Sequence, residues 1–198
     1  MRDPKLEALL HSLETSLLEK PQDFQGRHVA DTVFKALRDF PGKARETRSG
    51  YLPVLDNLPR ALEISKSHSS RTQPLGVALE QVLFRVPWKQ SKLHTDSAFN
   101  ERLANAVIVG DGGLEERLDF TIGISLAAPG AGYPLHNHPP EELYLAMAGG
   151  EFRHGDDDWT PVETGETFYN SPGIFHAMRA SNEPLLAIWI FGGADQAK

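Results

Sequence analysis

The sequence contains no cysteine. Disulfide bonds and thiolate ligands are therefore excluded, and any bound metal has to be held by nitrogen and oxygen donors. Positive charge is also scarce, because 20 Lys and Arg stand against 27 Asp and Glu, which gives a formal net charge of -7. This balance argues against broad nucleic-acid binding, so we expect no nucleic-acid partner.

Long apolar runs are absent too, and none approaches the roughly 20 residues that a membrane span needs. The first residues, M-R-D-P-K-L-E-A-L-L-H, lack the apolar stretch and the small-residue cleavage site that are typical of a secretory signal. We therefore expect a cytoplasmic protein without a membrane partner. The chain has 198 residues, 40% of them hydrophobic, which is enough to build a substantial core.

The first 84 residues predict helices. Asp3 followed by Pro4 is typical of an N-cap and a first helical turn. Leucines then recur at helical spacing: Leu6, Leu9, Leu10, Leu13 and Leu17. Further helices are expected over residues 27–40, 59–65 and 74–84, with a loop at S-K-S-H-S-S-R-T-Q. We expect this segment to cover one edge of the remaining structure or to form the contact of a homodimer.

After Val86 the pattern changes to short apolar runs separated by Gly, Pro, Asn and Asp. The clearest runs are A-N-A-V-I-V-G, L-D-F-T-I-G-I-S-L-A, E-L-Y-L-A-M-A, T-F-Y-N and L-L-A-I-W-I-F. Many short strands of this kind indicate a mostly β sandwich or barrel. The expected organisation is a helical segment, residues 1–84, packed on a β-barrel, residues 85–198.

Three histidines and one carboxylate form the strongest candidate site. On a strand, His136 and His138 would point to the same face, because side chains alternate with a period of two. Glu142 can join them across a turn, and His176 follows a second turn, S-P-G-I-F-H. Three imidazoles and one carboxylate suit Zn, Fe, Mn, Co or Ni, and the sequence does not distinguish among these ions. The alternative for each histidine is a hydrogen-bonded core residue.

Two tyrosines are candidates for a general base. Tyr144 lies two residues after Glu142, so on a strand it would share the face of that ligand, and Tyr133 lies in the expected loop before the histidines. A phenol near a divalent ion loses its proton more easily than its ordinary pKa of about 10 suggests. The alternative for Tyr144 is a core aromatic residue that is hydrogen-bonded to a ligand. Both tyrosines stay candidates.

The segment from Gly130 to Gly149 resembles the first motif of the cupin superfamily, G(x)5HxH(x)3-4E(x)6G, position by position. The second motif, G(x)5PxG(x)2H(x)3N, is matched only in part, because Pro172 and Gly173 are adjacent and the next asparagine, Asn182, lies too far along. The resemblance implies a double-stranded β-helix, or jelly-roll barrel, with a metal inside its mouth and an N-terminal helical extension.

The pattern H-x-H-x-x-x-E-x-Y with a distant histidine, behind a helical segment, resembles the cupin-type dimethylsulfoniopropionate (DMSP) lyases of bacteria, the DddQ and DddL group. This resemblance implies a metal-dependent carbon–sulfur lyase that releases acrylate and dimethyl sulfide by base-catalysed β-elimination. The implied metal residues are His136, His138, Glu142 and His176, and the implied base is Tyr144 or Tyr133. The partner would be a small zwitterion, whose cationic end needs aromatic faces rather than acids.

Other activities use the same four ligands. One alternative is a cupin dioxygenase or isomerase that acts on another small carboxylate, and oxygen consumption would reveal the dioxygenase. Another is a non-catalytic cupin that binds a small molecule and retains metal without turnover. A lyase with a different substrate would carry the same motifs.

Overall fold

The computed structural model describes residues 2–18, 24–93 and 97–192. Its helices are α1 (Pro4–Leu18), α2 (Arg27–Asp39), the 3-10 helix η1 (Pro53–Asn57), α3 (Leu58–His68), α4 (Thr72–Glu80) and α5 (Ser97–Asn100). Its strands are β1 (Lys43–Ala44), β2 (Lys89–Gln90), β3 (Leu103–Val109), β4 (Glu115–Glu116), β5 (Thr121–Ala127), β6 (Gly132–His136), β7 (Glu142–Ala148), β8 (Gly150–His154), β9 (Thr160–Val162), β10 (Thr167–Asn170), β11 (His176–Arg179) and β12 (Leu185–Phe191).

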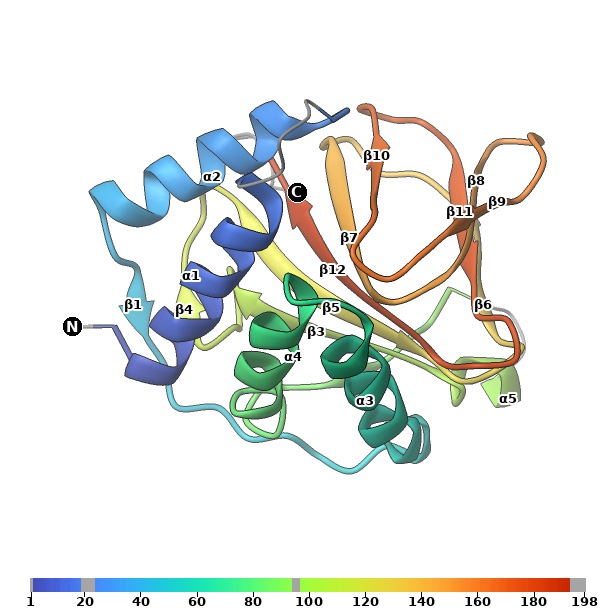
Figure 1. The fold of residues 1–198 in the computed structure, drawn as a ribbon, viewed down its shortest axis with the longest axis horizontal. Coiled ribbons are helices and arrows are strands. Elements are labelled where there is room, and N and C mark those ends of the chain that lie inside the picture. Colours follow the sequence, from blue (N-terminus) through green and yellow to red (C-terminus); the bar gives the residue numbers. More distant parts are fainter. Residues whose placement is uncertain (1, 19–23, 94–96, 193–198) are drawn as a thin grey trace.

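The strands form two sheets. The larger sheet has the order β1-β4-β3-β5-β12-β7-β10, with β2 paired to β3, and the smaller has the order β6-β11-β8-β9. Figure 1 shows the smaller sheet facing the β7–β10 end of the larger one, so that the two enclose a barrel. The predicted fold class is confirmed: the structure is mostly β, with a jelly-roll barrel and an N-terminal helical extension.

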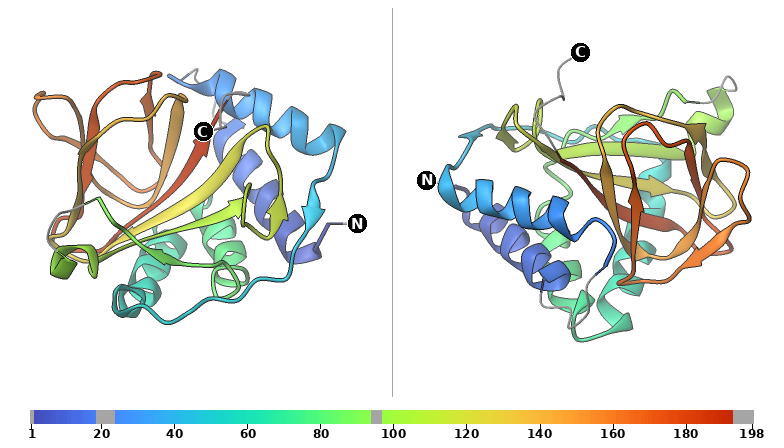
Figure 2. Two further views of the ribbon diagram at one scale, coloured as in Figure 1. Left: turned by 180° about the vertical axis from the view of Figure 1, so that it is seen from behind. Right: turned by 90° about the horizontal axis from the view of Figure 1, so that it is seen from above.

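The central strands of the larger sheet are apolar on both of their faces. All seven residues of β7 are buried, and the neighbouring β12 is buried except at Phe191. One face forms the barrel wall, while the helices α3 and α4 lie on the outer side, as the two views of Figure 2 show. Buried Ser65 on α3 donates a hydrogen bond of 2.5 Å to the carbonyl of Met147 on β7. Strands that are covered on both faces are expected to be continuously apolar, as these are.

The N-terminal helices follow the predicted pattern closely. The Asp3 carboxylate accepts hydrogen bonds from the backbone of Lys5 (2.9 Å) and Leu6 (3.1 Å), which confirms the predicted N-cap. The leucine stripe of α1 is buried. Two predicted boundaries are wrong: α3 extends through His68 into the expected loop, and α4 ends at Glu80 rather than at residue 84. Within the described ranges, no helix combines the length and apolar character that crossing a bilayer requires.

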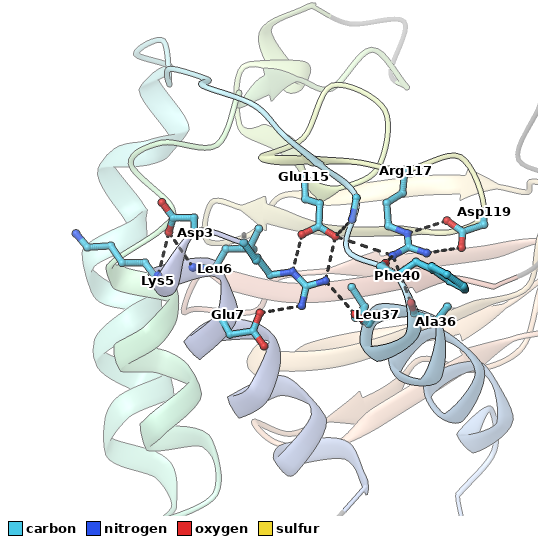
Figure 3. Close-up of polar contacts among 12 residues, drawn as sticks. Asp3, Lys5, Leu6, Glu7, Ala36, Leu37, Phe40, Glu115, Arg117 and Asp119 are labelled. Carbon is cyan, nitrogen blue, oxygen red and sulfur yellow. Dashed lines mark hydrogen bonds and ion pairs between the residues drawn. The ribbon is translucent and has the colours of Figure 1, made fainter.

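A network of ion pairs connects the N-terminus to the edge of the larger sheet (Figure 3). Arg2 Nε lies 2.5 Å from the carboxylate of Glu115 on β4, which is only 2% exposed. The backbone of Gly42 donates to the same carboxylate at 2.8 Å, and β1 pairs with β4 beside it. Residues from both sides of the expected division at 84–85 therefore share one sheet, and that division stays a prediction.

Candidate metal centre

The structure brings the three predicted histidines together where the smaller sheet meets the loop between β6 and β7. His136 ends β6 and is the Cα partner of His176, which begins β11. Their rings lie 4.3 Å apart, and the ring of His138 lies 4.9 Å from that of His176. One ligand atom from each histidine lies within 4.8 Å of the others. The expectation that both residues of the H-x-H pair lie on a strand is wrong, because β6 ends at His136 and His138 lies in the loop.

Each of the three imidazoles is oriented by a backbone carbonyl two residues away. The contacts are His136 Nδ1 to Pro134 O (2.7 Å), His138 Nδ1 to Pro140 O (2.9 Å) and His176 Nδ1 to Ile174 O (3.1 Å). A carbonyl only accepts hydrogen bonds, so each Nδ1 carries the proton and donates it. In the neutral ring, Nε2 then carries the free lone pair, which is the arrangement that orients histidines as metal ligands.

Glu142 adds a buried negative charge to this cluster. It begins β7, is 2% exposed, and its Oε2 lies 3.1 Å from His138 Nε2 and 3.2 Å from His176 Nε2. Burial raises the pKa of Glu142, but the hydrogen bond to His138 and the proximity of His176 outweigh burial and lower the pKa to about 2. The carboxylate is therefore ionised.

The pKa values of the two partly exposed histidines move in opposite directions. Burial is the first cause of the lowered pKa of His136, which favours its neutral, ligand-competent form. Burial also acts to lower the pKa of His138, but its hydrogen bond to Glu142 and the charge of that residue outweigh it and raise the pKa. Metal binding at His138 therefore has to displace a proton, so binding at this centre is expected to depend on pH.

One buried atom of the cluster lacks a hydrogen-bond partner. His176 Nε2 approaches Glu142 without hydrogen-bond geometry and has no other partner among the described residues. A buried polar atom without a protein partner is rare and is typical of a position that binds an ion or a water molecule. Here the atom points at a carboxylate and two imidazoles, so a cation fits the position. The three histidines can hold a metal ion, and the N/O donor set suits a divalent transition metal.

A cavity of about 160 Å³ opens beside this centre. Three of the four predicted ligands line it, namely His136, His138 and Glu142. Other lining residues include Asn105, Ser125, Tyr133, Tyr144, Trp189 and Phe191. The sequence names the two tyrosines as candidate bases, and it predicts aromatic faces without assigning them to Trp189 and Phe191. It gives no signal for Asn105 and Ser125, which stand in otherwise apolar strands.

The two tyrosines occupy different surroundings in this cavity. Tyr144 is buried, its ring lies 6.4 Å from that of His176, and its pKa is raised well above the ordinary value by burial and then by the charge of Glu142 and a hydrogen bond to it. Tyr133 lies on β6, not in a loop as expected, and its hydroxyl contacts the carbonyl of Ala104 (2.9 Å) and Asn105 Oδ1 (3.0 Å). Burial also raises the pKa of Tyr133. Tyr144 thus lies near the ligands, while the Tyr133 hydroxyl is hydrogen-bonded to β3.

The aromatic wall of the cavity depends on a glycine in β5. Trp189 on β12 is the Cα partner of Gly123, and a Cβ at position 123 would lie 2.1 Å from Trp189 Cζ2. The Trp189 ring packs 4.8 Å from that of Phe191, which in turn lies 4.6 Å from the ring of His138. Gly123 therefore gives the indole the space it needs to lie against the sheet beside the metal centre.

Comparison with known proteins identifies the family. The model of the dimethylsulfoniopropionate lyase family matches residues 25–187. The chain belongs to this family. It is similar to the DMSP lyase DddQ of Ruegeria pomeroyi, with 28% identity over 111 residues. That match covers 56% of this chain and 54% of DddQ, so it spans about half the length of the curated relative.

Two solved structures extend the likeness over the whole fold. A crystal structure from a study of the DMSP lyases RdDddP and RnDddQII has a TM-score of 0.74 and 25% identity, and the match covers 98% of this chain and 95% of that one. The crystal structure of DddQ from Ruegeria pomeroyi has a TM-score of 0.69 and 19% identity, covering 99% and 95% of the two chains. The predicted resemblance to the cupin-type DMSP lyases is confirmed.

Proposed function

We propose that the protein is a metal-dependent carbon–sulfur lyase that cleaves dimethylsulfoniopropionate to acrylate, dimethyl sulfide and a proton. Membership of the DMSP lyase family supports the reaction. The observation that carries the proposal is the convergence of three imidazoles and an ionised Glu142 on a cavity that also holds two buried tyrosines. We propose His136, His138, Glu142 and His176 as the metal residues.

The reaction needs a base but no oxidant. The base removes a proton from the carbon next to the substrate carboxylate, and the electron pair of that C–H bond forms the double bond of acrylate. The bond between the β-carbon and sulfur breaks, and its electron pair leaves with sulfur as neutral dimethyl sulfide. When bound, a divalent cation supplies positive charge that acidifies this α-proton and offsets the Glu142 charge that raises the pKa of Tyr144.

We propose Tyr144 as the base and keep Tyr133 as the alternative. The charge of Glu142 contributes to the raised pKa of Tyr144, and the Tyr144 ring lies 6.4 Å from that of His176, so Tyr144 lies beside the ligands. The hydroxyl of Tyr133 is directed instead at a carbonyl oxygen of β3, where it serves as a donor. A base has to lie within hydrogen-bond reach of the proton that it removes, and this geometric condition favours Tyr144.

The remaining walls suit the two ends of a zwitterion. Trp189 and Phe191 offer aromatic faces to a sulfonium, and among the described residues that line the cavity Glu142 is the only carboxylate. Asn105 Oδ1 accepts a hydrogen bond of 2.6 Å from Ser125, while the single proton of the Tyr133 hydroxyl is donated to the Ala104 carbonyl. This orientation leaves Asn105 Nδ2 as a donor for the substrate carboxylate.

Product analysis under anaerobic conditions tests the proposal. The purified protein is loaded separately with Zn, Fe, Mn, Co or Ni and incubated with DMSP, and headspace dimethyl sulfide and dissolved acrylate are measured. We expect equal amounts of the two products without oxygen. Absence of both products with every metal would refute the activity, and turnover that requires oxygen would indicate a dioxygenase. A homodimer and a cytoplasmic location stay predictions, which light scattering and cell fractionation test.

A further inference from the structure

A buried asparagine lies behind the carboxylate ligand, on the side away from the cavity. Asn170 is 0% exposed, and its Nδ2 donates a hydrogen bond of 2.9 Å to Glu142 Oε2. The two residues are Cα partners on the neighbouring strands β10 and β7. Asn170 is not among the residues that line the cavity. Its contact with the site therefore runs through Glu142 alone.

The orientation of this amide is set by a histidine of the other sheet. A carboxylate only accepts hydrogen bonds, so the amide atom that faces Glu142 has to be the nitrogen of Asn170. The oxygen then lies on the far side, 2.9 Å from His154 Nε2. Since an amide oxygen only accepts, His154 carries a proton on Nε2 and donates it. A turned amide would place its oxygen, an acceptor, against the carboxylate oxygen of Glu142, and its nitrogen, a donor, against the Nε2–H of His154.

The hydrogen-bonded chain His154–Asn170–Glu142 connects the two sheets at the level of the metal centre. His154 on β8 is the Cα partner of His176 on β11, in the smaller sheet. Asn170 and Glu142 are partners in the larger sheet. The ring of His154 also packs 4.6 Å from that of Phe168, which limits its rotation. The bond from His154 to Asn170 thus joins the strand pair β8–β11 of the smaller sheet to the strand pair β10–β7 of the larger sheet.

We propose that Asn170 and His154 are positioning residues that hold the carboxylate of Glu142 in the orientation in which it serves as a metal ligand. Asn170 acts directly on Glu142, and His154 acts only through Asn170. The inference rests on the metal site of the proposed function and is independent of the substrate. Loss of a residue that supports a ligand typically costs about 10–100-fold in metal affinity, which is the loss expected for Asn170→Ala.

Metal affinity and the ligand field are the readouts. Competition with a chelator gives the Zn²⁺ affinity, and the visible absorption spectrum of the Co²⁺-loaded protein reports the ligand geometry. The variants are Asn170→Ala, His154→Phe, His154→Gln and the double variant Asn170→Ala/His154→Phe. The matched controls are Asn182→Ala and His68→Phe, because both wild-type residues are exposed.

Asn170→Ala is expected to bind Zn²⁺ about 10–100-fold more weakly and to shift the Co²⁺ spectrum. His154→Phe should bind Zn²⁺ about three- to tenfold more weakly than the wild type. His154→Gln, whose amide nitrogen can still donate a hydrogen bond to Asn170, should keep nearly the wild-type affinity. His154→Phe should add nothing in the Asn170→Ala background, because the effects of residues that act as one unit do not add. The less buried His154 keeps the test valid if Asn170→Ala fails to fold.

Several outcomes would overturn the inference. Wild-type affinity and spectrum in Asn170→Ala would do so, as would a His154→Phe loss that persists in the double variant or that His154→Gln does not rescue. A lower melting temperature of the metal-free variants with unchanged metal affinity would show a merely structural role. Wild-type protein that binds metal but releases no dimethyl sulfide would refute the proposed activity and leave this inference standing, whereas wild-type protein that binds no metal would refute both.

Discussion

The two sheets contribute different chemistry to the same centre. The larger sheet supplies the oxygen-bearing and aromatic side chains, Glu142 and Tyr144 from β7 and Trp189 from β12. The smaller sheet supplies imidazoles, His136 from β6 and His176 from β11. The central strands of the larger sheet, β3, β5, β7 and β12, have seven residues each and are mostly buried, whereas β8 of the smaller sheet has only its central residue buried. The carboxylate ligand and the proposed base therefore come from one wall of the barrel, and two of the imidazole ligands come from the opposite wall.

This difference has an electrostatic reason. A carboxylate on a buried strand costs free energy unless it is paired and hydrogen-bonded. Within the larger sheet Asn170 donates a hydrogen bond to Glu142, and the imidazoles that compensate its charge come from His138 in the loop and His176 in the smaller sheet. The ionised carboxylate is thus stable only when the two sheets close on each other. We expect the centre to form as part of the folded barrel, not on either sheet alone.

The largest effects are expected when either wall loses a ligand. Glu142→Ala removes the negative charge, and His176→Ala removes an imidazole and one of the contacts that compensate the buried carboxylate. Each should reduce metal content and DMSP cleavage by more than the roughly 10–100-fold that loss of a supporting residue costs. Elemental analysis of the purified variants checks this, with His68→Ala as a control on the surface. Full metal content in both variants would contradict the proposed site.

Removing the proposed base should separate chemistry from metal binding. Tyr144→Phe keeps the ring against Phe152, 5.4 Å away, but loses the hydroxyl. We expect metal content to stay at the wild-type level and kcat to fall by about a hundredfold or more, the scale for a lost general base. Tyr133→Phe is the matched comparison and should keep a much larger share of kcat. The reverse result would assign the base to Tyr133.

The same contrast explains what could be predicted from the sequence. The five apolar runs identified there correspond to β3, β5, β7, β10 and β12, all in the larger sheet, because strands buried on both faces are continuously apolar. The strands of the smaller sheet carry no such signal. In β8, G-E-F-R-H, only Phe152 is buried, so its composition resembles that of a loop. The smaller sheet is held mainly by pairing with neighbours that are distant in sequence.

The candidate site shows the same limit. The motif named six residues, and the structure brings them to one cavity or to its edge, because their spacing is fixed by one loop and two strands. Asn170 and His154 could not be predicted, since an asparagine in T-F-Y-N and a histidine before a turn have no motif. Their role depends on β10 and β8 meeting across the two sheets. The local periodicity of the sequence does not predict long-range pairings of this kind.

A smaller effect is expected from the aromatic wall of the larger sheet. Gly123→Ala places a Cβ 2.1 Å from Trp189 Cζ2, so the indole has to move. Overpacking of this kind typically costs about 1–3 kcal/mol of unfolding free energy. We also expect KM for DMSP to rise while metal content is unchanged, because Trp189 lines the cavity but contacts no ligand atom. Gly50→Ala, where a Cβ meets nothing within 4 Å, is the control. An unchanged KM would show that Trp189 does not contribute to the substrate site.

The smallest effect is expected at the far edge of the larger sheet, where an ion pair stabilises the fold but is not part of the metal centre. Asp119 accepts two hydrogen bonds from Arg117 (2.9 and 2.7 Å), and these bonds are the first cause of its lowered pKa. A carboxylate whose pKa is lower in the folded state than in the unfolded chain stabilises the protein at pH values above its unfolded pKa of about 3.9. This contribution is lost as the pH falls through the folded pKa.

Asp119→Asn should therefore lower the free energy of unfolding by less than about 1 kcal/mol at pH 7, because the Asp119 side chain is about half exposed, and the deficit should shrink at pH 3. Urea unfolding at both pH values measures it. Asp156→Asn in the β8–β9 loop is the control, since its side chain forms no ion pair within the described part of the chain. A deficit of equal size at pH 3 would show that the Asp119 carboxylate stabilises the edge by packing rather than by charge. Reduced metal content in Asp119→Asn would show that this edge is coupled to the centre after all.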